Sequence, residues 1–333
     1  MKHQYGFAVL TAALFLSACP DGETDLPEQC LVTYKMYPED GASRAYYRTS
    51  VDAAFNQVVD GATLTLVDSS GADVAGATAW DSKRLVFTPA APLAPGASYT
   101  ATINFECIGE TQNESVTWTV SEVGGVTDLD AVVGSSYALD LKNARYLKPD
   151  GLGDLVGQFL TFDILLSVKD HTAGDLDVFG ALGVDGQPGK QAPCTETIDF
   201  PTADASANPY FELGPQLFEV TVADTEVTIE DLYLSGSFAP DGSYIDGAIL
   251  SGIIDTRPFA SLVEDDPDAP DDAVCKLAES VEIDCVACPD GSGDFCLELV
   301  ADSISAVSDG IDALVEIPDP CVLDECKDDD ACK

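Results

Sequence analysis

The chain has 333 residues, 46% of them hydrophobic, and its 15 basic and 59 acidic residues give a net charge of −44 at pH 7. This charge repels nucleic acid and anionic lipid headgroups, so the composition argues against a nucleic-acid partner. The length and apolar content are sufficient for two domains with buried cores. We expect the acidic residues mainly to solvate the surface, with binding of calcium or a basic partner as the alternative.

The first eighteen residues have the character of an export signal. Lys2 gives a positive start, Phe7–Leu16 is a nearly unbroken apolar run, and two small residues follow. A transmembrane helix needs about 20 apolar residues, so this run is too short to span a bilayer, and no later segment is a second candidate. We therefore expect residues 1–18 to be a targeting segment.

The residues that end this segment are Leu16-Ser17-Ala18-Cys19. They resemble the lipobox of bacterial lipoproteins, in which the signal is cut before a cysteine that carries the lipid. The resemblance implies that Cys19 is lipidated, that residues 19–29 link it to the folded part, and that the chain is tethered to a membrane without spanning it. Pro20 separates Cys19 from Asp21, which favours the outer membrane or cell surface over the inner membrane. An ordinary secretory signal with a chance cysteine is the alternative.

Ten further cysteines remain, an even number that predicts a disulfide framework in an exported chain. They are Cys30, Cys107, Cys194, Cys275, Cys285, Cys288, Cys296, Cys321, Cys326 and Cys332. We expect Cys30 to pair with Cys107, because no other mature cysteine lies in the first domain, and the other pairings stay open. Cys285-x-x-Cys288 could instead begin a zinc site, although no second close pair and no nearby histidine accompany it.

Four segments near the start of the mature chain alternate apolar and polar residues, which is the period of a half-buried strand. They are residues 62–67, 84–88, 98–105 and 115–120. Their inward residues would be Leu64, Leu66, Leu85, Phe87, Tyr99, Ala101, Ile103, Phe105, Val116, Trp118 and Val120. Turn signals such as Pro95-Gly96 lie between the segments. The pattern predicts a β-sandwich.

Residues 84–103, RLVFTPAAPLAPGASYTATI, resemble the signature of bacterial Ig-like domains of the S-layer type. There a strand ending in Thr-Pro leads into Leu-x-Pro-Gly-x-x-Tyr, here Leu93–Tyr99, and Tyr99 has the place of a tyrosine corner. Pro38–Gly41 and the inward Phe55 match the opening of the family. The resemblance covers about residues 30–121 and implies an Ig-like fold. It says little about function, because such modules serve as spacers, adhesins and enzyme appendages.

Residues 122–130 are expected to be a linker, and residues 131–310 a second β-rich domain. Residues 235–257 predict a hairpin with Ala239–Gly242 as its turn. Glycines within its strands predict bulges or strong curvature, as in a barrel or a coiled sandwich: Gly236, Gly247 and Gly252.

The most continuous apolar stretch of the mature chain is residues 152–168, for which we expect a buried strand, with a short helix at Leu152–Phe159 as the alternative. Residues 311–333 are expected to be a Cys-rich acidic tail. The predicted fold class is therefore all-β: an Ig-like β-sandwich followed by a larger antiparallel β domain, sandwich or barrel-like, stapled by disulfides.

Evidence for catalysis is sparse. His171 is the one histidine of the mature chain, and we expect it in a polar turn between strands. Ser-His-Asp or Cys-His catalysis would need it, but no Gly-x-Ser-x-Gly elbow or His-Glu-x-x-His helix supports such a site. A surface histidine without a catalytic role is favoured. A glycosidase-like carboxylate pair can be proposed among so many acids, but no pair stands out. We assign no catalytic residue.

Calcium is the one cofactor that the sequence raises. Asp290, Ser292 and Asp294 alternate, a spacing that lets a tight loop aim oxygens at one centre. Phe295 stands where an EF-hand loop has its glycine, and no glutamate stands at the twelfth position, with Asp302 one residue beyond it, so a solvated turn is favoured. The acidic stretch 264–272 is also expected to be a solvated loop.

These observations predict an exported, lipid-anchored, non-catalytic protein that presents its second domain to a protein or glycan partner, for binding, adhesion or a structural role in the envelope. One alternative is an extracytoplasmic hydrolase of a polysaccharide or ester with an Ig-like spacer. Another is a carrier of lipid or a small ligand. The interior of the second domain separates the three: filled for the binder, an open acidic cleft for the enzyme, and an apolar hollow for the carrier.

Overall fold

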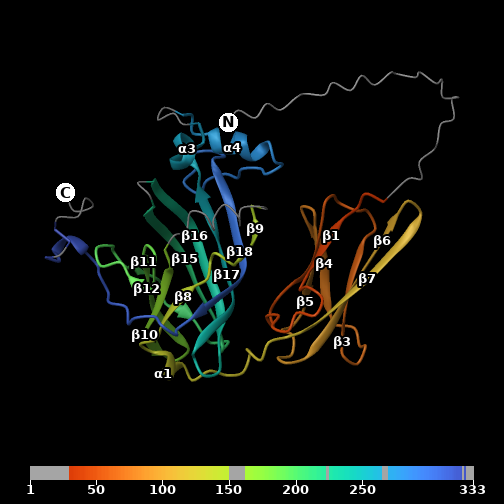
Figure 1. The fold of residues 1–333 in the computed structure, drawn as a ribbon, viewed down its shortest axis with the longest axis horizontal. Coiled ribbons are helices and arrows are strands. Elements are labelled where there is room, and N and C mark those ends of the chain that lie inside the picture. The colour runs from red at the N-terminus through yellow and green to blue at the C-terminus, as the bar shows by residue number, and fades with distance from the viewer. Residues whose placement is uncertain (1–29, 150–161, 223–224, 265–268, 325, 328–333) are drawn as a thin grey trace, which may run out of the picture.

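The computed structural model describes residues 30–149, 162–222, 225–264, 269–324 and 326–327. Nearly all of their regular structure is β, in two bodies, a sandwich and a larger barrel (Figure 1). The predicted all-β fold class is confirmed.

Seven strands in two antiparallel sheets form the sandwich, in the orders β1-β2-β5-β4 and β3-β6-β7. The strands are β1 (Tyr34–Tyr37), β2 (Val51–Phe55), β3 (Thr63–Asp68), β4 (Gly76–Asp81), β5 (Arg84–Pro89), β6 (Ser98–Cys107) and β7 (Glu110–Thr119). The inward residues predicted from the alternation are buried between the sheets, except Val116, which is half-buried. The two-residue period of a strand thus suffices to define this core.

The corner before β6 has the predicted tyrosine geometry. The backbone N–H of Ala94 donates to the hydroxyl of Tyr99 at 2.9 Å, and the ring of Tyr99 is buried. Phe55, expected to point inward from the family resemblance, is also buried. A disulfide joins Cys30 to Cys107 at the end of β6, which is the pairing that the sequence favours.

Eight strands of the second body close into a barrel in the order β10-β8-β18-β17-β16-β15-β14-β11, and β11 pairs back with β10. The barrel strands are β8 (Ser136–Leu139), β10 (Ile164–Thr172), β11 (Asp175–Val184), β14 (Ala203–Asp204), β15 (Tyr210–Val222), β16 (Thr225–Phe238), β17 (Tyr244–Asp255) and β18 (Cys296–Val307). Added at its rim are β9 (Arg145–Lys148), β12 (Gln187–Gln191) and β13 (Ile198–Asp199). The short helices are α1 (Leu129–Val132), η1 (Arg257–Phe259), α3 (Ala260–Glu264), α4 (Ala273–Glu279) and η2 (Pro320–Val322).

A cluster of buried side chains lies inside the barrel. Tyr137, Phe211 and Phe238 pack against one another at the end near α1, with aliphatic residues from every neighbouring strand. The hydroxyl of Tyr137 donates to the carbonyl of Gly242 at 2.8 Å, and burial raises the pKa of Tyr137 to about 12. This end of the interior is therefore a packed core.

The predicted hairpin is confirmed, with β16 and β17 joined through Ala239–Gly242. Bulges interrupt the ladder next to Gly236 and Gly247, as expected. Gly252 differs, because it pairs regularly with Leu299 while the bulge lies opposite it in β16. There Asp231 has a φ of 50°, and a Cβ on Gly252 would lie 2.6 Å from Ile229.

Two other expectations fall near β10. Within the apolar stretch 152–168, residues 164–168 belong to β10, whereas the alternative helix at Leu152–Phe159 lies outside the described residues. The turn expected around His171 lies two residues later, at Ala173-Gly174, and His171 is in the strand opposite Leu176.

The tail runs back along the barrel after β18. The side-chain amide of Gln191 donates to the carbonyl of Val315 at 2.7 Å, and Thr197 exchanges hydrogen bonds with Ile317. A disulfide between Cys194 and Cys326 secures the end of this segment. The tail is therefore fixed to the loop that follows β12.

Candidate ligand-binding cleft

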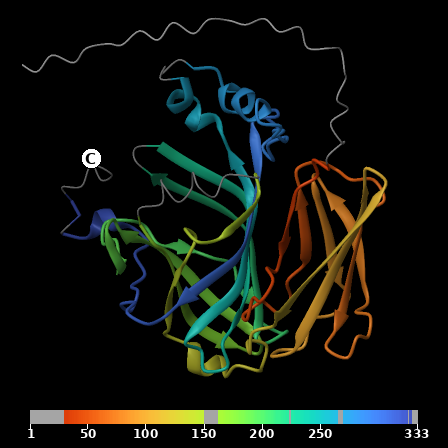
Figure 2. The ribbon, with the colours of Figure 1, turned by 45° about the vertical axis from the view of Figure 1, so that its right-hand side comes forward.

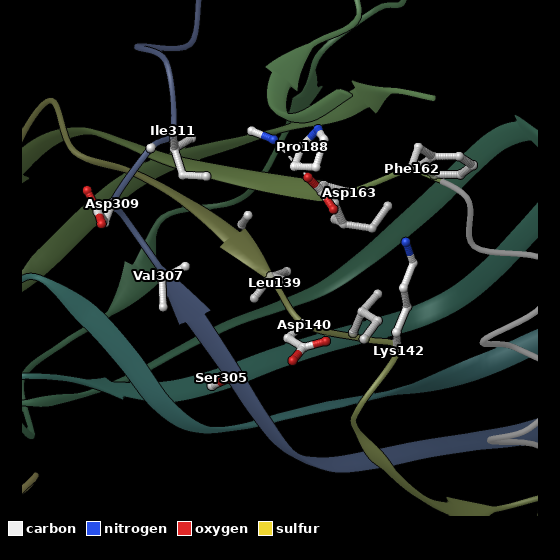
Figure 3. A pocket seen from close by; sticks show the side chains of 15 residues that line it. Leu139, Asp140, Lys142, Phe162, Asp163, Pro188, Ser305, Val307, Asp309 and Ile311 are labelled. Carbon is white, nitrogen blue, oxygen red and sulfur yellow. Dashed lines mark hydrogen bonds between the residues drawn. The ribbon is translucent and has the colours of Figure 1, made fainter. Parts of the chain in front are cut away.

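One hollow lies against the wall of the barrel. It has a volume of about 430 Å³ and is bordered by β8, the start of β10, β12 and the segment after β18 (Figure 3). Outward-facing residues of the wall, such as Ala138, Ser305 and Val307, form part of its floor. The cleft therefore exists because the tail and the β11–β12 hairpin stand against the barrel wall.

Close packing of two loops shapes one side of the cleft. Gly189 in β12 has a φ of 75°, and a Cβ there would lie 2.7 Å from the carbonyl oxygen of Gly310. The backbone N–H of Asp312 also donates to the carbonyl of Gly189 at 3.2 Å. Only glycine allows this approach, so β12 and the tail form one border.

Three carboxylates face the cleft: Asp140, Asp163 and Asp309. Asp140 accepts hydrogen bonds from the backbone and side chain of Asn143, which fixes the turn after β8. Asp163 accepts the backbone N–H of Gly189 at 2.8 Å, which ties the start of β10 to β12. Each carboxylate keeps further lone pairs with which to accept hydrogen bonds from a ligand.

Apolar groups complete the lining. Leu139, Val307, Ile311 and Pro188 lie between the carboxylates, and Lys142 adds a cation at the edge (Figure 3). Few polar groups around an apolar floor are typical of sites for small ligands. Hydrogen-bond acceptors, one ammonium group and apolar surface together suit a ligand with hydroxyl groups and apolar faces.

The cleft carboxylates do not form a metal site in the part of the chain that the structure describes. Among the described residues, the group of three donor atoms that lie within 4.8 Å of one another belongs to Asp255, Cys288 and Cys296. Two of these are sulfurs already joined in a disulfide, so no thiolate is available to bind a metal there.

The structure places the predicted calcium residues on a turn beside Arg257. One oxygen of Asp290 accepts the backbone N–H of Ser292 at 2.8 Å, and the other lies 3.0 Å from the guanidinium of Arg257. Hydrogen bonding from Ser292, together with Arg257, lowers the pKa of Asp290 from 3.8 to about 2. Asp290 is therefore already engaged by a cation of the protein.

His171 lies beside an acid. Its Nδ1 is 2.8 Å from the carboxylate of Asp130, and the backbone N–H of Gly174 donates weakly to its Nε2 at 3.4 Å. Both ring nitrogens thus have partners on the nearby turn and α1.

Disulfides occupy the predicted cysteines that the structure describes. Besides Cys30–Cys107 and Cys194–Cys326, bonds join Cys275 to Cys285 and Cys288 to Cys296. Cys321 is also disulfide-bonded, while Cys19 and Cys332 lie outside the described residues. The two cysteines considered as the start of a zinc site therefore belong to different disulfides.

The cleft residues were not among those singled out from the sequence. Asp140, Asp163 and Asp309 are distant along the chain, and each stands in an ordinary polar context among the 59 acidic residues. Gly189 and Gly310 could indicate a close approach of two backbone segments, because glycine permits such an approach. Nothing in the sequence connects the two glycines, however.

Comparison with known proteins identifies the sandwich. A family model described as a bacterial Ig-like domain matches residues 31–122. This family, together with the disulfides, indicates an exported or extracellular protein. A search of the curated proteins found no match. No helix among the described residues is sufficiently long and apolar to cross a membrane.

Solved structures from Listeria monocytogenes show only a distant similarity. The cycloalternan-forming enzyme in complex with a pentasaccharide substrate is 11% identical, with 83% of this chain and 30% of that chain covered and a TM-score of 0.18. An uncharacterized protein from strain EGD-e is 10% identical, with 82% and 30% covered and a TM-score of 0.19. The chain thus spans about 30% of the length of these proteins, and the TM-scores are too low to support an argument.

Proposed function

We propose that this protein is a lipid-anchored, non-catalytic binding protein of the bacterial envelope, and that its outer cleft binds a glycan. The observation that carries the proposal is a cleft of about 430 Å³ with three carboxylates, which lies against the wall of a barrel that has a packed core near α1. Sugar rings combine hydroxyl groups with apolar faces, which match the carboxylates and the apolar floor.

Binding fits the cleft better than hydrolysis does. Asp140 and Asp163 both accept hydrogen bonds that hold their own loops in place. A hydrolase of the glycosidase type needs two carboxyl groups placed on either side of the scissile bond, one of them protonated. The cleft acids hold the walls of the cleft in place, and this structural role supports ligand binding without hydrolysis.

A glycan array provides the test for ligand binding. Wild-type protein is expected to bind a subset of bacterial envelope polysaccharides, and Asp163→Asn to weaken that binding by about tenfold, because hydrogen bonds to charged groups contribute about 1.5–3 kcal/mol. Asp204→Asn is the matched control, since Asp204 also stabilises a turn through Ser206 but lies outside the cleft. Absence of glycan binding, or equal loss in both variants, would contradict the proposal. Release of reducing ends would favour a hydrolase instead.

The anchor is tested separately. We expect the wild-type chain to incorporate labelled palmitate in its bacterial host and to partition into the detergent phase of Triton X-114, and Cys19→Ala to lose both properties. An unlabelled wild-type chain would show that residues 1–18 are an ordinary secretory signal.

A further inference from the structure

A buried charge cluster lies between the sandwich and the barrel, which stand side by side (Figures 1 and 2). Arg145 of β9 makes two hydrogen bonds to the carboxylate of Asp302 of β18, at 2.8 and 2.6 Å. Its third nitrogen donates to Asp52 of β2, in the sandwich, at 2.7 Å. One guanidinium therefore joins both bodies of the molecule.

The surroundings satisfy this cluster on all sides. The side chain of Asp52 is only 3% exposed, and a second cation, Arg84, lies 3.8 Å from it. The ring of Tyr37 stacks on Arg145 at 3.4 Å, and its hydroxyl is 2.6 Å from that of Ser303 in β18. These partners come from both bodies, so the buried charges keep them only while the two bodies stay in contact.

Uncharged contacts extend the same interface. The hydroxyls of Tyr46 and Tyr47 lie 2.7 and 3.0 Å from the hydroxyl of Ser237, which is completely buried in the barrel. The ring of Tyr46 packs directly on Gly247 of β17, where a Cβ would lie only 2.0 Å away. These contacts extend the interface along β16 and β17.

The connection between the bodies is also fixed. Thr127, within the expected linker 122–130, exchanges two hydrogen bonds with the side chain of Asn208, at 2.9 and 2.8 Å. Its hydroxyl donates to the carbonyl of Ala239 at 3.0 Å. The linker is therefore held to the barrel at Thr127.

We infer that Arg145 locks the sandwich and the barrel into one rigid unit, so that the Ig-like domain is a fixed part of the barrel assembly and not a flexible spacer. Domains of one chain are expected to move relative to each other unless their interface prevents it. Without Arg145, the buried Asp52 and Asp302 would face each other with much less compensation. Separation of the two bodies would then hydrate both acids. This inference does not depend on the ligand of the cleft.

The test compares Arg145→Met with Arg257→Met in the chain from residue 20 onward, which keeps every described residue. Arg257 is the matched control, because it also makes a close pair, with Asp255 at 2.6 Å, but away from the sandwich. We expect wild type and Arg257→Met to give X-ray scattering curves that fit one compact arrangement and to unfold in one calorimetric transition. Arg145→Met should show a larger maximum dimension and two transitions.

Two results would overturn the inference. One is a folded Arg145→Met protein whose scattering and single transition equal those of the control. The other needs no variant, and so applies even if Arg145→Met does not fold: wild-type scattering that fits only a broad range of arrangements of the two bodies.

Discussion

The carboxylate of Asp290 makes stability depend on pH. Its pKa in the folded protein is about 2, below the ordinary 3.8, so the ionised form is stabilised by folding. The resulting stability is complete above pH 3.8 and is lost as the pH falls towards 2. We expect Asp290→Asn to lower the urea midpoint at pH 7 and to match wild type at pH 2. A difference independent of pH would mean that Ser292 and Arg257 do not favour the charged form.

Among the described glycines, Gly247 is the one at which an added Cβ would make the closest contact. Its φ is 60°, and a Cβ would lie 2.0 Å from the ring of Tyr46. We expect Gly247→Ala to lower the free energy of unfolding by about 3 kcal/mol or more, through backbone strain and overpacking together. Gly186→Ala is the control, because φ there is 67° but the site is open, so strain alone should cost about 1 kcal/mol. Equal losses in urea unfolding would show that Tyr46 moves aside easily.

The role of a residue can be predicted from the sequence when its partners are close by along the chain. The partner of Tyr99 lies five residues upstream, and the inward positions of β5 and β6 follow from alternation, so all could be predicted. The cleft acids could not, because Asp140 and Asp309 become neighbours only through the closure of the barrel and the return of the tail. The same holds for Asp52 and Arg145, whose pairing depends on how two separate bodies dock.

At the scale of elements, disulfides differ in the length of chain that they close. Cys30 and Cys107 are 77 residues apart, whereas Cys288 and Cys296 are separated by 8. In the chain-entropy model, the disulfide that closes the longer loop stabilises the folded state by about 4.5 kcal/mol, and the one that closes the shorter loop by about 2.5 kcal/mol. We therefore expect serine replacement of the first pair to lower the free energy of unfolding more than replacement of the second. Urea titration of both double variants tests this order, and a reversed order would point to local packing around Cys288 as the larger effect.

The hairpin of β16 and β17 shows how far periodicity reaches. Val227 and Ile229 alternate in one phase and Leu232 and Leu234 in the other, and the change of phase coincides with the bulge at Asp231. A shift of one residue turns the following side chains to the opposite face, so a bulge is needed to keep both pairs directed consistently. Whether such curved strands close into a barrel depends on the pairing of β10 with β11 and β8, which are remote in sequence from the hairpin. For this reason the sequence alone does not distinguish a barrel from a sandwich.

At the scale of the whole molecule, an excess of 44 negative charges opposes the compact state through self-repulsion. Salt weakens this repulsion, because the Debye length falls from about 30 Å at 0.01 M to about 3 Å at 1 M ionic strength. We expect the melting temperature to rise by a few degrees as NaCl is increased over this range. Calcium chloride at equal ionic strength distinguishes screening from specific binding, since a bound ion adds stability that grows with the logarithm of its concentration. A melting temperature that falls with NaCl would mean that attractive ion pairs outweigh the net repulsion. An additional rise with calcium that Asp290→Asn and Asp294→Asn abolish would establish the calcium site that the sequence raised.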